Sequence, residues 1–251
     1  MNFKISVYFF FIILMNSCMP KNEETLLNIG HRGARGHVAE NTLESIKKAL
    51  ELGADGVEID VFKCKSGEIV VIHDETLNRT TNGKGNVEDF TLGELKSFVV
   101  EGAYKIPTLV EVLDMLDAKY VINIELKGKN TAKATNSIIE DYIKNDGWEK
   151  NQFVVSSFDW DELRDFYELN KEIPIGILSE DEPLDAIEIA KELNAFSIHP
   201  YHIHLNEEEV NRIHKEGFKI YTWTVNKPDD IKNMIDLGVD AIITDYPERV
   251  K

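Results

Sequence analysis

Short apolar runs alternate with amphipathic stretches along most of the chain after residue 25. The apolar runs have the length and the β-branched content of strands, whereas the stretches between them repeat apolar positions at the spacing of a helix. We expect strands at residues 27–30, 56–62, 121–126, 153–156, 174–178, 195–199, 219–224 and 241–244. We expect helices at residues 42–52, 131–145, 160–169, 183–193, 207–216 and 228–237.

Strands that alternate with helices predict an α/β fold, in which a parallel sheet closes into a (β/α)8 or TIM barrel. An open doubly wound sheet is the alternative. Residues from about 75 to 105 break the alternation, because they are rich in Thr, Asn and Gly and hold one short helical pattern near 92–98. We interpret them as a small insertion after the second strand, at the rim where barrel active sites form. The barrel domain is expected to cover residues 26–251.

The second predicted strand carries the most informative pattern. Residues 57–61 read Val-Glu-Ile-Asp-Val, so Glu58 and Asp60 share one face of the strand. Two neighbouring carboxylates on an apolar strand repel each other and resist dehydration, and a divalent cation would remove both problems. A surface strand with a solvated acidic face is the plain alternative.

Other polar residues fall at the carboxyl ends of predicted strands, which is the catalytic end of a barrel. They are His31 and Arg32 after the first strand, His73 and Asp74 after a short hairpin arm, Asn123, Glu125 and Lys127 on the third strand, and Trp223 at the end of the seventh.

Three carboxylates, from Glu58, Asp60 and Glu125, suit a hard cation such as Ca²⁺ or Mg²⁺, with Mn²⁺ as a further candidate. Zinc fits less well, because the chain offers no His-x-x-x-His motif and no cysteine pair for it. The histidines His31 and His73 suit general acid–base catalysis near neutral pH.

Arg32 and Lys127 could donate hydrogen bonds to a phosphate. Together with the cation and the histidines they indicate cleavage of a phosphate ester. Plainer interpretations remain for single residues, since Lys127 could simply pair with Glu125 and Trp223 could fill the barrel. His199 and His202 have no evident partner and are interpreted as structural.

Composition narrows the class of protein. The 251 residues are 43% hydrophobic, which is enough for a large core, and the formal net charge is −17. Such a charge argues against nucleic acid as a partner. The sequence does not indicate an oligomeric state.

The N-terminus resembles a bacterial lipoprotein signal. An apolar run at residues 5–15 follows Lys4 and leads to Ser17 and Cys18. We expect a signal peptide at residues 1–17, a lipidated Cys18 and a linker at 18–25, with ordinary secretion as the alternative. The protein would then be exported and attached to a membrane only through its lipid. Cys64 would have no partner for an intramolecular disulfide, and we interpret it as a packed thiol.

Two segments resemble one another. Residues 51–60 and 236–245 each contain a Leu-Gly pair, an Asp, an apolar strand and a terminal acid. We interpret the likeness as shared helix-to-strand geometry rather than duplicated chemistry.

Seven groups of motifs resemble the glycerophosphodiester phosphodiesterase family, in the family's order and over almost all of the mature chain. They lie at residues 31–36 (His-Arg-Gly-Ala-Arg-Gly), 40–43 (Glu-Asn-Thr-Leu), 53–61, 71–74 with 79–81, 106–109, 123–127, and 221–226 with 243–247. One departure lies at residues 64–67, where Cys-Lys-Ser-Gly replaces a frequent Thr-Lys-Asp-Gly beside the site.

The resemblance implies a barrel that hydrolyses glycerophosphodiesters to glycerol 3-phosphate and an alcohol. It also implies one divalent cation on Glu58, Asp60 and Glu125, with His31 and His73 as catalytic residues. Arg32 and Lys127 would bind the phosphate. Our hypothesis assigns His31 as the base and His73 as the acid, and Trp223 as a substrate-binding wall.

Two other functions compete with this hypothesis. A metal-independent phosphoinositide-type phospholipase C on a similar barrel would need a cationic side chain in place of the metal. A non-catalytic lipoprotein that only binds phosphodiesters would be expected to lack an acid or a histidine.

Overall fold

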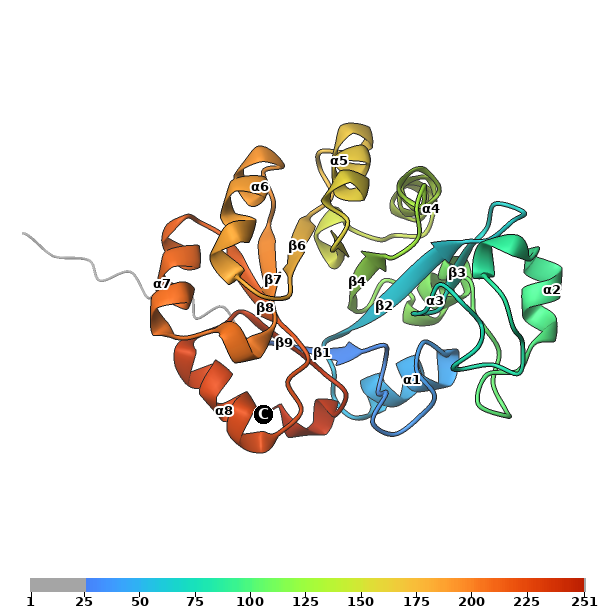
Figure 1. Cartoon of the computed structure of the whole chain (residues 1–251), viewed down its shortest axis with the longest axis horizontal. Coiled ribbons are helices and arrows are strands. Elements are labelled where there is room, and N and C mark those ends of the chain that lie inside the picture. The colour runs from blue at the N-terminus through green and yellow to red at the C-terminus, as the bar shows by residue number, and fades with distance from the viewer. Residues whose placement is uncertain (1–25, 251) are drawn as a thin grey trace, which may run out of the picture.

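A ring of parallel strands lies at the centre of the computed structural model, which describes residues 26–250 (Figure 1). The strands of the ring are β1 (Leu27–His31), β2 (Gly56–Lys63), β4 (Val121–Leu126), β5 (Phe153–Ser157), β6 (Ile175–Ser179), β7 (Ser197–Pro200), β8 (Lys219–Thr222) and β9 (Ala241–Thr244). A further strand, β3 (Ile69–Val71), pairs antiparallel with the end of β2.

Pairing between the first and last strands closes the ring. β1 pairs with β9 on one side and with β2 on the other, and both pairings are parallel. An open doubly wound sheet would leave two free edges, so the closed pairing confirms the predicted TIM barrel. The eight predicted strands are the eight strands of the described ring. The one at 219–224 ends earlier, at Thr222, and Trp223 adds a single bridge to Tyr201.

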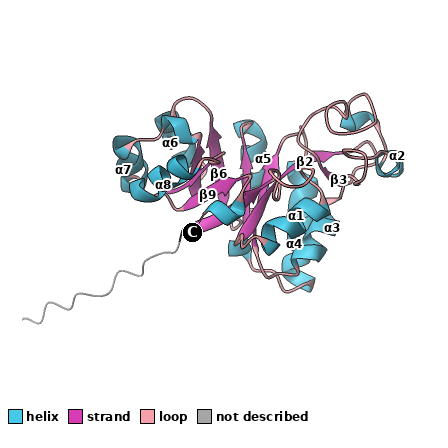
Figure 2. Ribbon diagram, turned by 90° about the horizontal axis from the view of Figure 1, so that it is seen from below, coloured by secondary structure: helices cyan, strands magenta, loops and turns pink. Residues whose placement is uncertain are grey.

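Helices surround the ring on its outer side (Figures 1 and 2). They are α1 (Leu43–Glu51), α3 (Leu109–Leu116), α4 (Ala132–Asn145), α5 (Trp160–Leu169), α6 (Ala186–Glu192), α7 (Glu207–Lys215) and α8 (Pro228–Leu237). A further helix, α2 (Leu92–Ser97), lies away from the ring, beyond β3. The predicted helix at 183–193 divides into a 3-10 turn, Pro183–Asp185, followed by α6. Helix α3 was not among the predicted helices. Within residues 26–250 no helix combines the length and the apolarity needed to cross a bilayer.

Strand alternation divides the core into two layers. Val57, Ile59 and Val61 of β2 point outward and belong to the large cluster between the strands and the helices. The inward positions form a small apolar cluster inside the barrel, made of Ile29, Val154, Tyr221, Ala241 and Ile243. On β2 and β4 the inward positions include Glu58, Asp60, Asn123 and Glu125, which places carboxylates in the barrel mouth.

The chain between β3 and α3 forms a small separate layer beside β2, with α2 at its outer end (Figure 2). It has its own apolar cluster, which includes Phe62, Leu77, Val87 and Leu95. Cys64 is buried in the same cluster, as expected for a packed thiol. That this layer is an insertion stays a prediction, and the predicted signal peptide, Cys18 and linker lie outside the described residues.

Candidate active site

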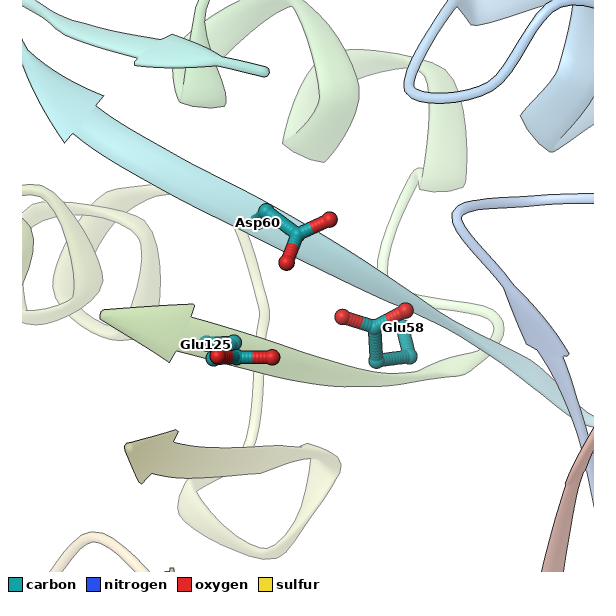
Figure 3. Close-up of side chains that lie close together, drawn as sticks. All are labelled: Glu58, Asp60 and Glu125. Carbon is teal, nitrogen blue, oxygen red and sulfur yellow. The ribbon is translucent and has the colours of Figure 1, made fainter. Parts of the chain in front are cut away.

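Three carboxylates meet inside the barrel mouth because β2 and β4 pair in register. Glu58 lies opposite Asn123, and Asp60 lies opposite Glu125. One oxygen from each of Glu58, Asp60 and Glu125 lies within 4.8 Å of the others, and all three residues are buried (Figure 3). The structure therefore brings together the three acids that the sequence proposed as metal ligands.

The crowding of negative charge shifts the pKa values of the three carboxyl groups. Burial, with the charges of Asp60 and Glu125, raises the pKa of Glu58 well above its usual range. Burial and the charge of Asp60 raise the pKa of Glu125 to about 7. Burial also opposes the charge of Asp60, but the Arg32 guanidinium lowers the pKa of that carboxyl. Keeping all three buried carboxylates ionised is thus electrostatically costly.

The unused oxygens of this cluster fit a divalent cation. Glu58 Oε1 and Asp60 Oδ1 are buried and have no hydrogen-bond partner. The other Asp60 oxygen accepts a bond from Asn41 Nδ2 at 2.8 Å and lies 3.3 Å from Arg32 Nε. Buried carboxylate oxygens without donors are costly, and oxygen ligands are what Ca²⁺ and Mg²⁺ prefer.

Each predicted catalytic histidine is paired with a carboxylate. His31 Nδ1 lies 2.6 Å from Asp245 Oδ1, and His73 Nδ1 lies 2.6 Å from Asp74 Oδ1. Because an ionised carboxylate can only accept, both Nδ1 atoms carry the proton and both Nε2 atoms are left to act on a ligand. Burial lowers the pKa of both histidines, which favours neutral imidazoles.

Asp245 was not among the predicted site residues. It follows β9, and the side-chain amide of Asn226 donates to its second oxygen at 2.8 Å. The side-chain oxygen of the same amide, Asn226 Oδ1, accepts from the Asp245 backbone N–H at 2.9 Å. The likeness between residues 51–60 and 236–245 could have indicated it, because Asp60 and Asp245 are the last residues of the two similar segments.

Arg32 is held at the cluster by its own backbone conformation. Its φ is +51°, in the left-handed region, and its backbone N–H donates to Glu58 Oε2 at 2.9 Å. Gly33 follows with φ +80°, and a Cβ there would lie 2.5 Å from the backbone of Ser45. This turn brings Arg32 Nη1 to 2.8 Å from Glu40 Oε1.

Glu40 is a second residue that sequence reasoning missed. Burial alone would raise its pKa, but hydrogen bonds from Arg79 and Arg32 lower the pKa to about 2. Arg79 also donates to both oxygens of Asp74, the partner of His73. Glu40 therefore binds Arg32 directly and is linked through Arg79 to Asp74, the partner of His73.

Glu58, Glu125 and both histidines line one pocket of about 140 Å³. An apolar wall made of Phe158, Leu178, Trp223 and Ile243 faces them. Trp223 stacks on Tyr201 with ring centroids 5.1 Å apart, and its Nε1 donates to the backbone of His199 at 2.7 Å. Trp223 therefore lines the pocket rather than only filling the barrel.

Lys127 pairs with Glu125, as the plainer interpretation expected, and phosphate binding by it stays a prediction. Its Nζ pairs with Glu125 Oε1 at 2.9 Å, and its side chain also lines the pocket. His199 does not line this pocket. It is fully buried, shares a 2.7 Å hydrogen bond with Ser197 Oγ, and has a pKa lowered by burial to about 3.

Comparisons with known proteins agree with the motif resemblance. The sequence profile of the "Glycerophosphoryl diester phosphodiesterase family" matches residues 31–249. The chain is 39% identical to the glycerophosphodiester phosphodiesterase of Caldanaerobacter subterraneus, over 89% of this chain and 96% of that protein. It is 40% identical to the glycerophosphodiester phosphodiesterase of Bacillus altitudinis, over 87% of this chain and 94% of that protein.

Solved structures resemble it as well. A phosphodiesterase of Oleispira antarctica, in complex with the product sn-glycerol-3-phosphate, superposes with a TM-score of 0.81 at 29% identity, over 88% of this chain and 94% of that one. A glycerophosphodiester phosphodiesterase of Thermotoga maritima gives a TM-score of 0.74 at 32% identity, over 89% of this chain and 96% of that one.

Proposed function

The chain belongs to the glycerophosphoryl diester phosphodiesterase family, and from that premise we propose that it hydrolyses glycerophosphodiesters to sn-glycerol 3-phosphate and an alcohol, using a divalent cation and two histidines. One observation carries the proposal: three buried carboxylates lie within 4.8 Å of one another, in a pocket that two carboxylate-bound histidines also line. The product bound to the Oleispira relative supports the choice of substrate.

Glu58, Asp60 and Glu125 would hold the cation, which we propose is Ca²⁺ or Mg²⁺, or else Mn²⁺. A bound cation supplies positive charge against the negative charge that develops on phosphate oxygens. Arg32 and Lys127 line the same pocket and would donate to the phosphate, Arg32 through the guanidinium nitrogen that Glu40 and Asp60 leave free.

The two histidines would carry out different proton transfers. His31 is buried, and burial lowers its pKa, which favours the neutral imidazole. Its Nε2 can then accept the proton of the attacking hydroxyl, which is either the glycerol 2-hydroxyl or a water. His73 is more exposed and would protonate the leaving alkoxide through its Nε2. Asp245 and Asp74 would stabilise whichever imidazolium forms. Trp223 would shape the apolar wall against the carbon skeleton of the substrate.

The proposal predicts large losses of turnover on glycerophosphocholine for two variants. His31→Ala and His73→Ala should each lower kcat by about 10²–10⁴-fold, because each removes one proton-transfer group. His204→Ala, which removes an exposed histidine outside the pocket, is the matched control and should stay within about twofold. Near wild-type turnover in both pocket variants would refute the assignment.

The same assay tests the cation. Exhaustive chelation should abolish turnover, and adding back Ca²⁺, Mg²⁺ or Mn²⁺ separately should restore it and identify the metal. Activity that survives chelation would instead favour a metal-independent phospholipase. Substrate binding without turnover under every cation would favour a non-catalytic binding protein.

We also propose that the protein is exported and anchored to a membrane through a lipid on Cys18. The support is the apolar run at residues 5–15 followed by Ser17 and Cys18. A Cys18→Ser variant should move from the membrane fraction to the soluble fraction of the exporting cell. Equal membrane association of the two proteins would contradict the anchor.

A further inference from the structure

Arg35 is a cation of the pocket that the proposed mechanism does not use. It lines the same pocket as His31, Arg32 and His73, and 39% of its side chain is exposed. Its backbone position is fixed on both sides, since the Ala34 N–H donates to Ser45 and the Gly36 N–H donates to Asp245, each at 3.0 Å. A long cationic side chain is therefore presented at the edge of the site from a fixed Cα.

The terminal nitrogens of Arg35 are available to a ligand. Its one ion pair among residues 26–250 joins Nε to Glu40 Oε2 at 3.1 Å. Glu40 does not depend on it, because Arg32 and Arg79 already donate three hydrogen bonds of 2.7 to 3.0 Å to the two Glu40 oxygens. The contact with Glu40 uses only Nε, so it gives no role to the Arg35 Nη1 and Nη2 atoms.

A guanidinium with free terminal nitrogens matches the paired oxygens of a carboxylate or a phosphate and repels a quaternary ammonium. We infer that Arg35 selects glycerophosphodiesters whose alcohol half carries a second anionic group, a carboxylate or a phosphate. This inference rests on the proposed function, and it names the substrate class of that same site.

Two substrates that differ by one carboxylate give the test. We expect the wild-type protein, loaded with its activating cation, to show a kcat/KM for glycerophosphoserine about 5- to 10-fold above that for glycerophosphoethanolamine, because a half-exposed charge-assisted bond is worth about that much. Arg35→Gln should remove this preference mainly through KM, since the interaction exists before the reaction begins. Arg35→Lys, which keeps the charge but not the fork, should retain part of it.

Arg164→Gln is the matched control, because Arg164 is also held by carboxylates but lies on α5 outside the pocket. It should keep the wild-type ratio. The wild-type ratio should also shrink as ionic strength rises. A wild-type ratio near one, or a ratio that Arg35→Gln leaves unchanged, overturns the inference while the proposed function stands. Failure to cleave either diester with any cation overturns the proposed function and this inference together.

Discussion

Asp245 and Asn226 form a support that fixes one ring nitrogen of His31. Asn226 bonds both the side chain and the backbone N–H of Asp245, so the carboxylate cannot turn away from the imidazole. The Asp245 oxygen nearest His31 lies only 2.6 Å from Nδ1. Such a carboxylate sets the tautomer of a catalytic histidine without touching the substrate. Asp245 is therefore a positioning residue in the proposed mechanism.

Asp245→Asn should lower kcat by about 10²–10⁴-fold with little change in KM. The amide can donate to Nδ1, which would place the imidazole proton on Nε2 and remove the acceptor that the base needs. Steady-state kinetics on glycerophosphocholine measure both constants, and thermal unfolding shows whether the variant is folded.

Asp240→Asn is a control on the same strand. Asp240 precedes β9 at the opposite end of the barrel and also accepts from a histidine, His214, at 2.8 Å. The variant makes the same chemical change to a His–Asp pair, so it should lose stability but keep kcat within about twofold. If both variants lost kcat equally, the effect would be on folding and the positioning role would be refuted.

Strand alternation could predict most of the acidic cluster but not Asp245, the carboxylate that holds His31 beside it. It placed Glu58 with Asp60 on one face of β2, and the strand ends placed Glu125 at the same end of the barrel. Asp245 follows the last residue of β9, so alternation along the strand could not give the direction of its side chain. Its contact with His31 depends on the local turn after β9 and on the pairing of β9 with β1.

At the level of elements, α3 shows why the helix prediction was incomplete. Its buried residues Leu109, Val112, Leu113 and Leu116 recur at helical spacing, but the exposed Val110 and the half-buried Met115 put apolar residues on the outer side of a helix only eight residues long. Its start was nevertheless encoded: Thr108 and Glu111 form a capping box, in which each side chain bonds the backbone of the other residue. The capping box together with this spacing predicts the helix.

The same cap joins α3 to the layer beside β2. Lys96 of α2 bonds the Glu111 carboxylate and also donates to the carbonyl of Ile106 at 2.8 Å. One charged side chain thus fixes the end of α2 against the start of α3. Long-range contacts of this kind have no signature in the local sequence. The region was therefore predicted as a break in the alternation, with one short helical pattern near 92–98 that the structure confirms as α2.

At the level of the whole molecule, barrel closure buries polar groups that an open sheet would leave in water. His199 is the clearest example, since it is fully buried inside the ring and stacked on Tyr221, and its Nδ1 has no hydrogen-bond partner. Gly176 on the neighbouring strand leaves room for the ring, because a Cβ there would lie 2.3 Å from His199 Nε2. The sequence indicated a structural histidine but not that closure would prevent it from taking up a proton.

This burial predicts how stability depends on pH. Burial lowers the pKa of His199 to about 3, whereas an unfolded histidine titrates near 6.5. Between these values the unfolded chain binds a proton that the folded barrel excludes, so the free energy of unfolding falls as the pH drops below about 6.5, by up to about 1.4 kcal/mol per pH unit.

His199→Gln removes that titration but can still bond Ser197. Its stability relative to wild type, measured by urea unfolding at intervals from pH 7.5 to 4.5, should therefore rise steadily as the pH falls. His204→Gln, which makes the same substitution at an exposed histidine, is the control for the loss of an imidazole. A pH-independent difference between His199→Gln and wild type would mean that the buried ring does take up a proton in the folded barrel.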